Sequence, residues 1–195
     1  MMKPSMLAHR LCMLLFIGHM LAGCAAAVVA GGATGAAVAY DRRTAGTILE
    51  DQAIETKAWQ SFRPDKEIND NAHINVTSYN TIVLVTGEAP NAELKERIIN
   101  IVRNIEKVSN VYDELTIAAP SSYVSRSSDS VITSKVKTEL VAMDNFAGAH
   151  VKVVTEKGIV YLMGLLAHEE ADRVTDVARK VGGVQKVVKL FQYTD

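Results

Sequence analysis

The sequence predicts an α+β protein built from two tandem αββαβ units, each a three-stranded mixed sheet packed on two helices. Three observations predict this fold. The body of the 195-residue chain repeats itself, and each copy contains two short segments rich in β-branched residues that flank a turn. Each copy also contains two segments with apolar residues at helical spacing. We expect the first unit at 46–118, a linker at 119–127 and the second unit at 128–195.

The repeat is clearest in the hairpin of each unit. Ile74–Gly87 aligns with Val151–Gly164 at a constant offset of 77 residues, and both segments end in glycine. Asp51 in the preceding helix matches Asp129 at an offset of 78, and the following helix and strand match at an offset of 76. Offsets that change only in the loops are typical of a duplicated domain.

In the first unit, the hairpin turn is expected at Asn80 and Thr81, without a glycine. The apolar spacing predicts helices near 47–62 and 91–107. The β-branched runs predict strands near 74–77, 82–86 and 111–117.

In the second unit, Asp129 or Ser130 can cap a helix that runs to about Met143. Gly158 supplies the hairpin turn, and Gly182-Gly183 ends the second helix. The expected strands are 151–154, 159–163 and 184–193, and the second helix is 168–181.

The N-terminus predicts an export signal. Lys3 and Arg10 precede an apolar run, Leu11–Leu21, which is shorter than the roughly 20 residues that a membrane span needs. The run leads into Leu21-Ala22-Gly23-Cys24, a lipobox, so we expect residues 1–23 to be removed and Cys24 to be acylated. The alternative is an uncleaved transmembrane anchor, because apolar character continues to Ala39, but glycines make that stretch a poor helix.

The mature chain would then begin with a lipid anchor and a flexible spacer, 24–45. Ala25, instead of an aspartate, favours sorting to the outer membrane, with the body facing the periplasm. The mature chain would have 172 residues, a formal charge of −3 and no cysteine other than Cys24, so no disulfide is expected. Mild acidity and few aromatic residues argue against nucleic-acid binding.

Three motifs of the second unit resemble the BON domain: Ile132–Val136, Val151–Gly164 and Gly183–Val187. The first unit departs from the pattern at Ala58, at the Asn80-Thr81 turn and at 109–111. A lipobox followed by two such units is similar to the dual-BON outer-membrane lipoproteins of Gram-negative bacteria. The resemblance implies that the second domain binds anionic phospholipid, such as phosphatidylglycerol or cardiolipin. It also implies a role in envelope integrity, without catalysis and without a cofactor.

Charge favours the second unit as the lipid-binding one, because it is neutral overall whereas the first has a net charge of −5. On its first helix, the core-facing arc is expected to consist of Ile132, Val136, Leu140 and Met143. The predicted phospholipid-binding face lies outside that arc and consists of Val131, Ser134, Lys135, Lys137, Thr138 and Val141. Isolated exposed valines and lysines are also common on ordinary solvated helices. This face has no large aromatic residue, so we expect shallow contact.

Two rival functions remain open. An enzyme is disfavoured because the sequence shows no nucleophile elbow and no phosphate-binding loop, so we expect no catalytic residue. His73 and His150 occupy matching positions, but duplication explains the match, and we expect no metal site. The stronger rival is a protein-interaction scaffold that docks an envelope assembly or division machine through the acidic first unit, with Glu93, Glu96 and Glu106 on its second helix.

Overall fold

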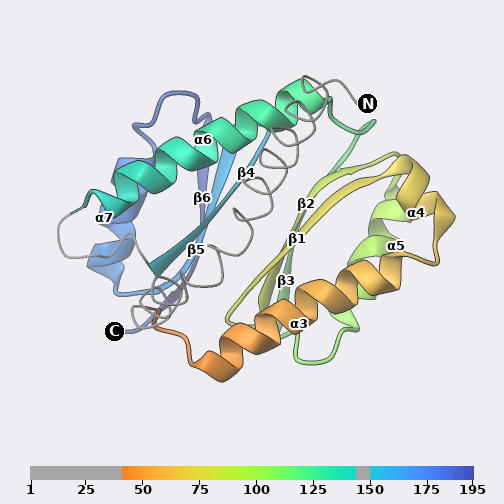
Figure 1. The fold of residues 1–195 in the computed structure, drawn as a ribbon, viewed down its shortest axis with the longest axis horizontal. Coiled ribbons are helices and arrows are strands. Elements are labelled where there is room, and N and C mark those ends of the chain that lie inside the picture. The colour runs from red at the N-terminus through yellow and green to blue at the C-terminus, as the bar shows by residue number, and fades with distance from the viewer. Residues whose placement is uncertain (1–40, 144–149) are drawn as a thin grey trace, which may run out of the picture. The chain divides into compact units, whose positions relative to one another are not determined.

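The computed structural model describes residues 41–143 and 150–195, and Arg42–Asp195 form one compact unit (Figure 1). The predicted signal peptide and the predicted acylation site, Cys24, lie outside the described residues. Within this unit the chain forms two αββαβ domains with separate sheets, as the sequence predicts. No helix in the described ranges is long and apolar enough to cross a bilayer.

Domain 1 forms its sheet from strands in the order β1-β2-β3. The hairpin pairs β1 and β2 antiparallel, and β3 returns parallel to β2 after the α5 crossover. The helix α3 precedes the hairpin, and a short helix α4, which sequence reasoning did not predict, follows α3. The bounds are α3 Ala45–Phe62, α4 Lys66–Asn71, β1 His73–Tyr79, β2 Ile82–Ala89, α5 Ala92–Arg103 and β3 Asn110–Ile117.

Domain 2 repeats this topology with the strand order β4-β5-β6. The first pair is again antiparallel and the second parallel. The bounds are α6 Tyr123–Val141, β4 Val151–Glu156, β5 Ile159–Leu166, α7 His168–Ala178 and β6 Lys186–Tyr193.

Each domain has its own core between its helices and one face of its sheet. In domain 1, Phe62, Val85 and Ile98 are completely or almost completely buried, and they come from α3, β2 and α5. In domain 2, Leu140 and Leu162 occupy comparable places in α6 and β5. The predicted core residues Ile132, Val136 and Leu140 are buried, which confirms most of the core-facing arc of that helix. The fourth, Met143, follows the end of α6 and is only partly buried against the same core.

The sheet faces that the helices leave open form a third apolar cluster, which joins the two domains. It contains Tyr79 and Leu84 of domain 1 together with Tyr161, Met163 and Leu190 of domain 2. The central strands β2 and β5 are therefore buried on both faces, which explains why they are nearly continuous apolar runs instead of alternating ones. The Tyr79 hydroxyl donates to the backbone oxygen of His150 at 3.0 Å, and Asn80 donates to Gln192 at 2.7 Å.

The segment before α3 also bridges the domains. The guanidinium of Arg42 makes two hydrogen bonds of 2.7 Å to the carboxylate of Glu170 and a third, of 3.1 Å, to the backbone oxygen of Leu165. The next residue, Arg43, pairs with Asp51 at 2.8 Å in domain 1. Two adjacent arginines thus attach the start of the described chain to both domains.

The first helix of domain 2 differs from the sequence expectation at its start. The helix α6 begins at Tyr123, six residues before Asp129, so most of the segment expected as a linker is helical. Ser122 is the N-cap and accepts a hydrogen bond from the Ser125 amide at 3.2 Å. Asp129 lies inside the helix, and its carboxylate accepts from the amides of Lys157 and Gly158 in the hairpin turn. It fixes that turn instead of capping the helix.

Candidate functional site

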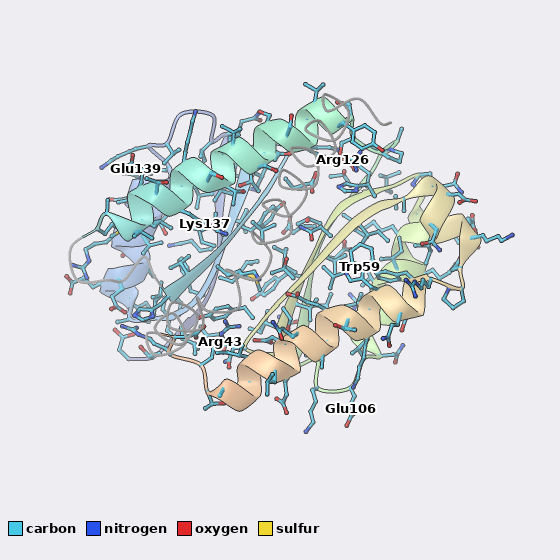
Figure 2. The ribbon with its side chains drawn as sticks, in the orientation of Figure 1. Arg43, Trp59, Glu106, Arg126, Lys137 and Glu139 are labelled. Carbon is cyan, nitrogen blue, oxygen red and sulfur yellow. The ribbon has the colours of Figure 1, made fainter. Side chains whose placement is uncertain are left out.

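All six residues of the predicted lipid-binding face are exposed on α6. Val131 is 53% exposed and Val141 is 68% exposed, although both are β-branched and apolar. Lys135 and Lys137 follow Val131 along this helix, and Figure 2 shows Lys137 and Glu139 on it. The face therefore combines uncovered valines with two cationic side chains.

A shallow depression of about 410 Å³ brings four of these six residues together: Val131, Ser134, Lys135 and Thr138. Ser130 and Glu139 complete its lining. Lys137 and Val141 lie outside the depression. A surface this open suits contact with a flat partner better than enclosure of a small molecule.

The helix face extends further than sequence reasoning predicted. Tyr123 is 85% exposed and Val124 is 78% exposed in the first turn of α6. Val124, Val131 and Thr138 are spaced by seven residues, which places them along one stripe of the helix. The prediction of a face without a large aromatic residue was therefore wrong, because Tyr123 belongs to the same helix. The signal that could have found it is Ser122, a capping residue that ends the Ala-Pro-Ser segment before it.

A second polar site lies at the domain interface, beyond the apolar part of the sheet contact. Glu88 of β2 is 0% exposed, and its carboxylate lies 2.7 Å from the Lys157 ammonium of domain 2. The other carboxylate oxygen accepts from the Ser121 amide at 3.1 Å. Lys157 also donates to the Thr116 hydroxyl at 3.1 Å. A buried carboxylate of domain 1 is thus held by a cation of domain 2.

Three more side chains complete this site, which we call the interface cluster: His73, Glu88, Arg126, Glu156 and Lys157. Arg126 of α6 lies 3.3 Å from Nδ1 of His73. Glu156 is 8% exposed, and its Oε1 atom has no hydrogen-bond partner. Ligand-type atoms of His73, Glu88 and Glu156 all lie within 4.8 Å of one another. Such a trio could approach a metal ion, but Arg126 and Lys157 already place two positive charges beside its two carboxylates.

The interface cluster shifts the pKa values of His73, Glu88 and Glu156. Burial raises the pKa of Glu156 to about 7, and the negative charges of Glu88 and Asp129 act in the same direction. Burial lowers the pKa of His73, and the charge of Arg126 adds to that effect. Burial also acts to raise the pKa of Glu88, but the hydrogen bonds from Lys157 and Ser121 and the charge of Lys157 together outweigh it, so that this pKa is lowered.

Part of this cluster was accessible from the sequence. A two-residue turn at Asn80 and Thr81 places Tyr79 opposite Ile82. Counting back along both strands from that pair places His73 opposite Glu88. Glu156 could not be found in this way, because it reaches the pair only through the packing of domain 2 on domain 1.

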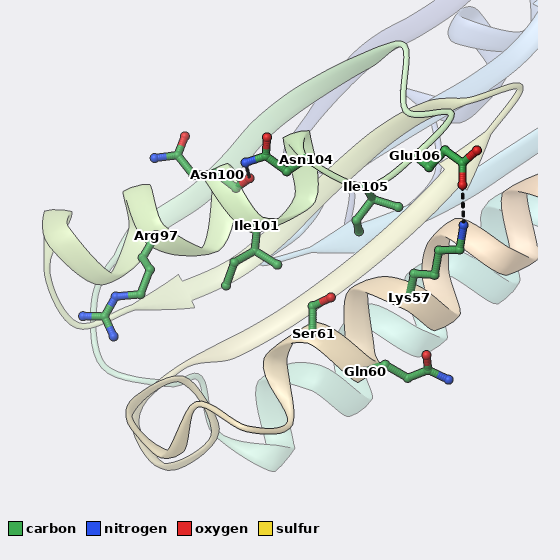
Figure 3. A pocket seen from close by; sticks show the side chains of 9 residues that line it. All are labelled: Lys57, Gln60, Ser61, Arg97, Asn100, Ile101, Asn104, Ile105 and Glu106. Carbon is green, nitrogen blue, oxygen red and sulfur yellow. Dashed lines mark hydrogen bonds and ion pairs between the residues drawn. The ribbon is translucent and has the colours of Figure 1, made fainter.

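A third surface feature is a groove of about 710 Å³ between α3 and α5 of domain 1 (Figure 3). Ile101 and Ile105 contribute its apolar part, and the ion pair between Lys57 and Glu106, 3.4 Å long, borders it. The remaining lining is dominated by amide and hydroxyl side chains: Gln60, Ser61, Asn100 and Asn104.

The comparison with protein families agrees with this architecture. The BON domain model matches residues 50–119 and 128–195, so the chain is a two-domain protein that belongs to the BON domain family. The resemblance inferred from the sequence motifs is confirmed.

Among individual proteins, the chain is 37% identical over 186 residues to the outer membrane lipoprotein DolP of Haemophilus influenzae, covering 95% of this chain and 96% of the relative. It is 36% identical over 153 residues to the 21 kDa hemolysin of Actinobacillus pleuropneumoniae, covering 78% and 79%. Among solved structures, CdsD of the Chlamydia trachomatis type III secretion system matches with a TM-score of 0.26 and 12% identity, covering 71% and 91%.

Proposed function

We propose that this protein is a lipid-anchored component of the outer membrane that faces the periplasm and binds anionic phospholipid through α6, without catalysing a reaction. The observation that carries the proposal is the exposed surface of α6, where the stripe residues Val124 and Val131, and Val141 beside the stripe, are uncovered on the same helix as Lys135 and Lys137. The 37% identical relative named as an outer membrane lipoprotein supports the location, and the lipobox at Cys24 supports the anchor.

The chemistry of the stripe suits an anionic interface. Each lysine near a negatively charged leaflet contributes about 1 kcal/mol of attraction, while the valines can enter the boundary between headgroups and acyl chains. Tyr123 adds an aromatic side chain at one end of the stripe. The contact is shallow, because the surrounding depression is open and Glu139 opposes the lysines.

The lipid anchor and α6 would act as two linked membrane-binding sites. A chain held by an acylated Cys24 keeps α6 at a high local concentration near the leaflet, so a weak contact suffices for occupancy. We infer that this coupling supports envelope integrity by keeping the domains on the membrane surface.

The test is sedimentation of the 42–195 fragment with vesicles that contain phosphatidylglycerol or cardiolipin. This fragment keeps Arg42 and corresponds to the compact unit. Reversing both charges, Lys135→Glu with Lys137→Glu, should weaken binding about 30-fold or more, because about 2 kcal/mol of attraction is lost and repulsion is added. Val131→Ser with Val141→Ser should weaken binding to a similar degree without changing its salt dependence.

The matched control changes the same number of charges on the other domain. Lys66→Glu with Lys107→Glu alters two exposed lysines of domain 1 and should leave vesicle binding within about twofold. Equal losses in both double variants would show that binding follows net charge alone, and would exclude α6 as the lipid site.

The groove between α3 and α5 favours a second candidate, a scaffold that docks an envelope protein through domain 1. A photoreactive residue in place of Gln60 or Asn100 tests it in cells. One dominant protein adduct at these positions supports the scaffold. Diffuse lipid adducts at Val124 or Val131 of α6, with none at the groove, support the lipid-binding function instead.

A further inference from the structure

The interface cluster closes the contact between the two domains at its polar end. On the face of β2 that points toward domain 2, Ile82 and Leu84 are apolar, whereas Thr86 and Glu88 are polar and buried. At the other end of this strand the domains meet through apolar packing, through the hydrogen bonds of Tyr79 and Asn80, and through the ion pair between Arg42 and Glu170. The charge state of the cluster therefore governs one end of the interface.

Glu156 is the unbalanced member of the cluster. Lys157 holds Glu88 at 2.7 Å, and Arg126 faces His73 at 3.3 Å, but the buried Oε1 of Glu156 has no partner. An ionised Glu156 is repelled by Glu88 from β2 and by Asp129 from α6, and is attracted by Lys157 and Arg126. The His73 ring approaches from β1. Tyr161 of β5 lies close enough for the charge of Glu156 to raise its pKa, and its hydroxyl donates to Glu114 at 3.2 Å.

A proton on Glu156 removes the repulsion and supplies a donor. A protonated carboxyl can donate a hydrogen bond toward Glu88 or His73, whose ligand-type atoms lie within 4.8 Å. An ionised carboxylate in the same place has no such donor and must draw in water or move away. The two protonation states therefore favour a closed and a loosened interface, respectively.

We propose that the interface cluster is a proton-dependent clasp, which holds the two domains together when Glu156 is protonated and loosens them when Glu156 ionises. Arg126 and Asp129 lie on α6, so the clasp also determines how firmly the start of this helix is attached to domain 1. The inference stands apart from the proposed lipid binding, because it concerns the contact between the domains in the absence of any ligand.

The direction of the pH dependence follows from linkage. The pKa of Glu156 in the folded protein, about 7, lies above its ordinary value of 4.5, so the folded state keeps a proton that the unfolded state has released. The stability tied to this proton is complete at low pH and is lost as the pH rises through about 7. His73 stays largely neutral above pH 6.5, because its pKa is lowered. Between pH 6.5 and 8.5, Glu156 therefore changes charge while His73 stays largely neutral.

The experiment measures the distance between the domains in the 42–195 fragment by pulsed electron spin resonance. The native sequence of this fragment contains no cysteine, so spin labels can be attached to Gln60→Cys on α3 and Ser134→Cys on α6. At pH 6.5, where about three quarters of Glu156 is protonated, a narrow distance distribution is expected. At pH 8.5, where only a few per cent is protonated, the distribution should broaden or shift to longer distances.

Two variants and one control make the result specific. Glu156→Gln carries no charge at either pH and should keep the narrow distribution at pH 8.5, whereas Glu88→Gln loses the pair with Lys157 and should broaden it at both values. Glu169→Gln, an exposed residue of α7, should behave as the unmodified sequence does. An identical pH response in the unmodified fragment and in Glu156→Gln would overturn the clasp. So would a response that a chelator abolishes, because a metal ion would then be closing the interface.

Discussion

Two buried aspartates hold the two hairpin turns in conformations that most residues avoid. Asp51 accepts from the amides of Asn80 and Thr81 at 2.8 and 2.9 Å, and both of these turn residues have positive φ angles. Asp129 binds the Lys157 and Gly158 amides of the second turn in the same way. The carboxylate offsets the cost of left-handed backbone at Thr81, a β-branched residue, which explains how the first turn forms without glycine.

Gly87 provides a test at the residue scale. Its φ is +116°, and a Cβ atom there would lie 2.0 Å from the backbone oxygen of His73, a contact that no side-chain movement can relieve. We expect Gly87→Ala to lower the free energy of unfolding by about 3 kcal/mol or more, measured by urea denaturation of the 42–195 fragment.

Gly182→Ala is the matched control for this substitution. A Cβ at Gly182 meets nothing within 4 Å, and the expected change is within about 0.5 kcal/mol. Comparable losses for the two variants would show that the close approach at Gly87 is not what limits stability.

At the scale of helices and strands, α7 differs from the other helices in the described ranges because its N-cap has no side-chain acceptor. Its N-cap is Ala167, while Glu170 accepts a hydrogen bond from the Ala167 amide at 2.9 Å. The backbone of Ala167 is extended, as a capping serine requires. Ala167→Ser would complete a capping box with Glu170 and should raise the free energy of unfolding by about 0.5–1 kcal/mol.

Removing the existing cap of α5 should change the free energy of unfolding in the opposite direction. Asn91 caps that helix by accepting from the Leu94 amide at 2.8 Å, and Asn91→Ala should lower stability by about 1 kcal/mol. For the α7 variant, a lower free energy of unfolding in Ala167→Ser would contradict the capping argument.

Elements with strong local signals could be predicted from the sequence, and those set by distant contacts could not. The hairpin and second helix of each domain were expected within a few residues, because β-branched runs and apolar spacing are local properties. The start of α6 was missed because its first turn is exposed, so its apolar residues do not continue the core-facing periodicity of the helix. The six residues of the lipid-binding face were correctly expected to be exposed, and their contact with lipid stays a prediction.

At the scale of the whole molecule, the apolar contact between the two sheets means that neither domain is complete alone. Separating the domains would expose Tyr79, Leu84 and their partners in domain 2. We expect a fragment of domain 1, 42–120, to self-associate in size-exclusion chromatography with light scattering, since an uncovered apolar sheet face favours association.

The substitution Leu84→Lys should improve the behaviour of the 42–120 fragment and destabilise the 42–195 fragment. Leu84→Lys should return the 42–120 fragment to a monomer, because a charge interrupts the exposed face. In the 42–195 fragment, where Leu84 is 0% exposed, the same change should lower stability by about 3 kcal/mol or more. A 42–120 fragment that is monomeric without the substitution would contradict the need for a covering domain.

The arginine pair before α3 has a mechanical consequence. A pull on the chain at residue 41 is transmitted first to Arg42, whose parallel bonds to Glu170 lie in domain 2, and only then to Arg43 and domain 1. Tension from the N-terminal side is thus shared by both halves instead of unwinding α3 from its end. A tethered body loaded in this way resists being peeled apart one domain at a time.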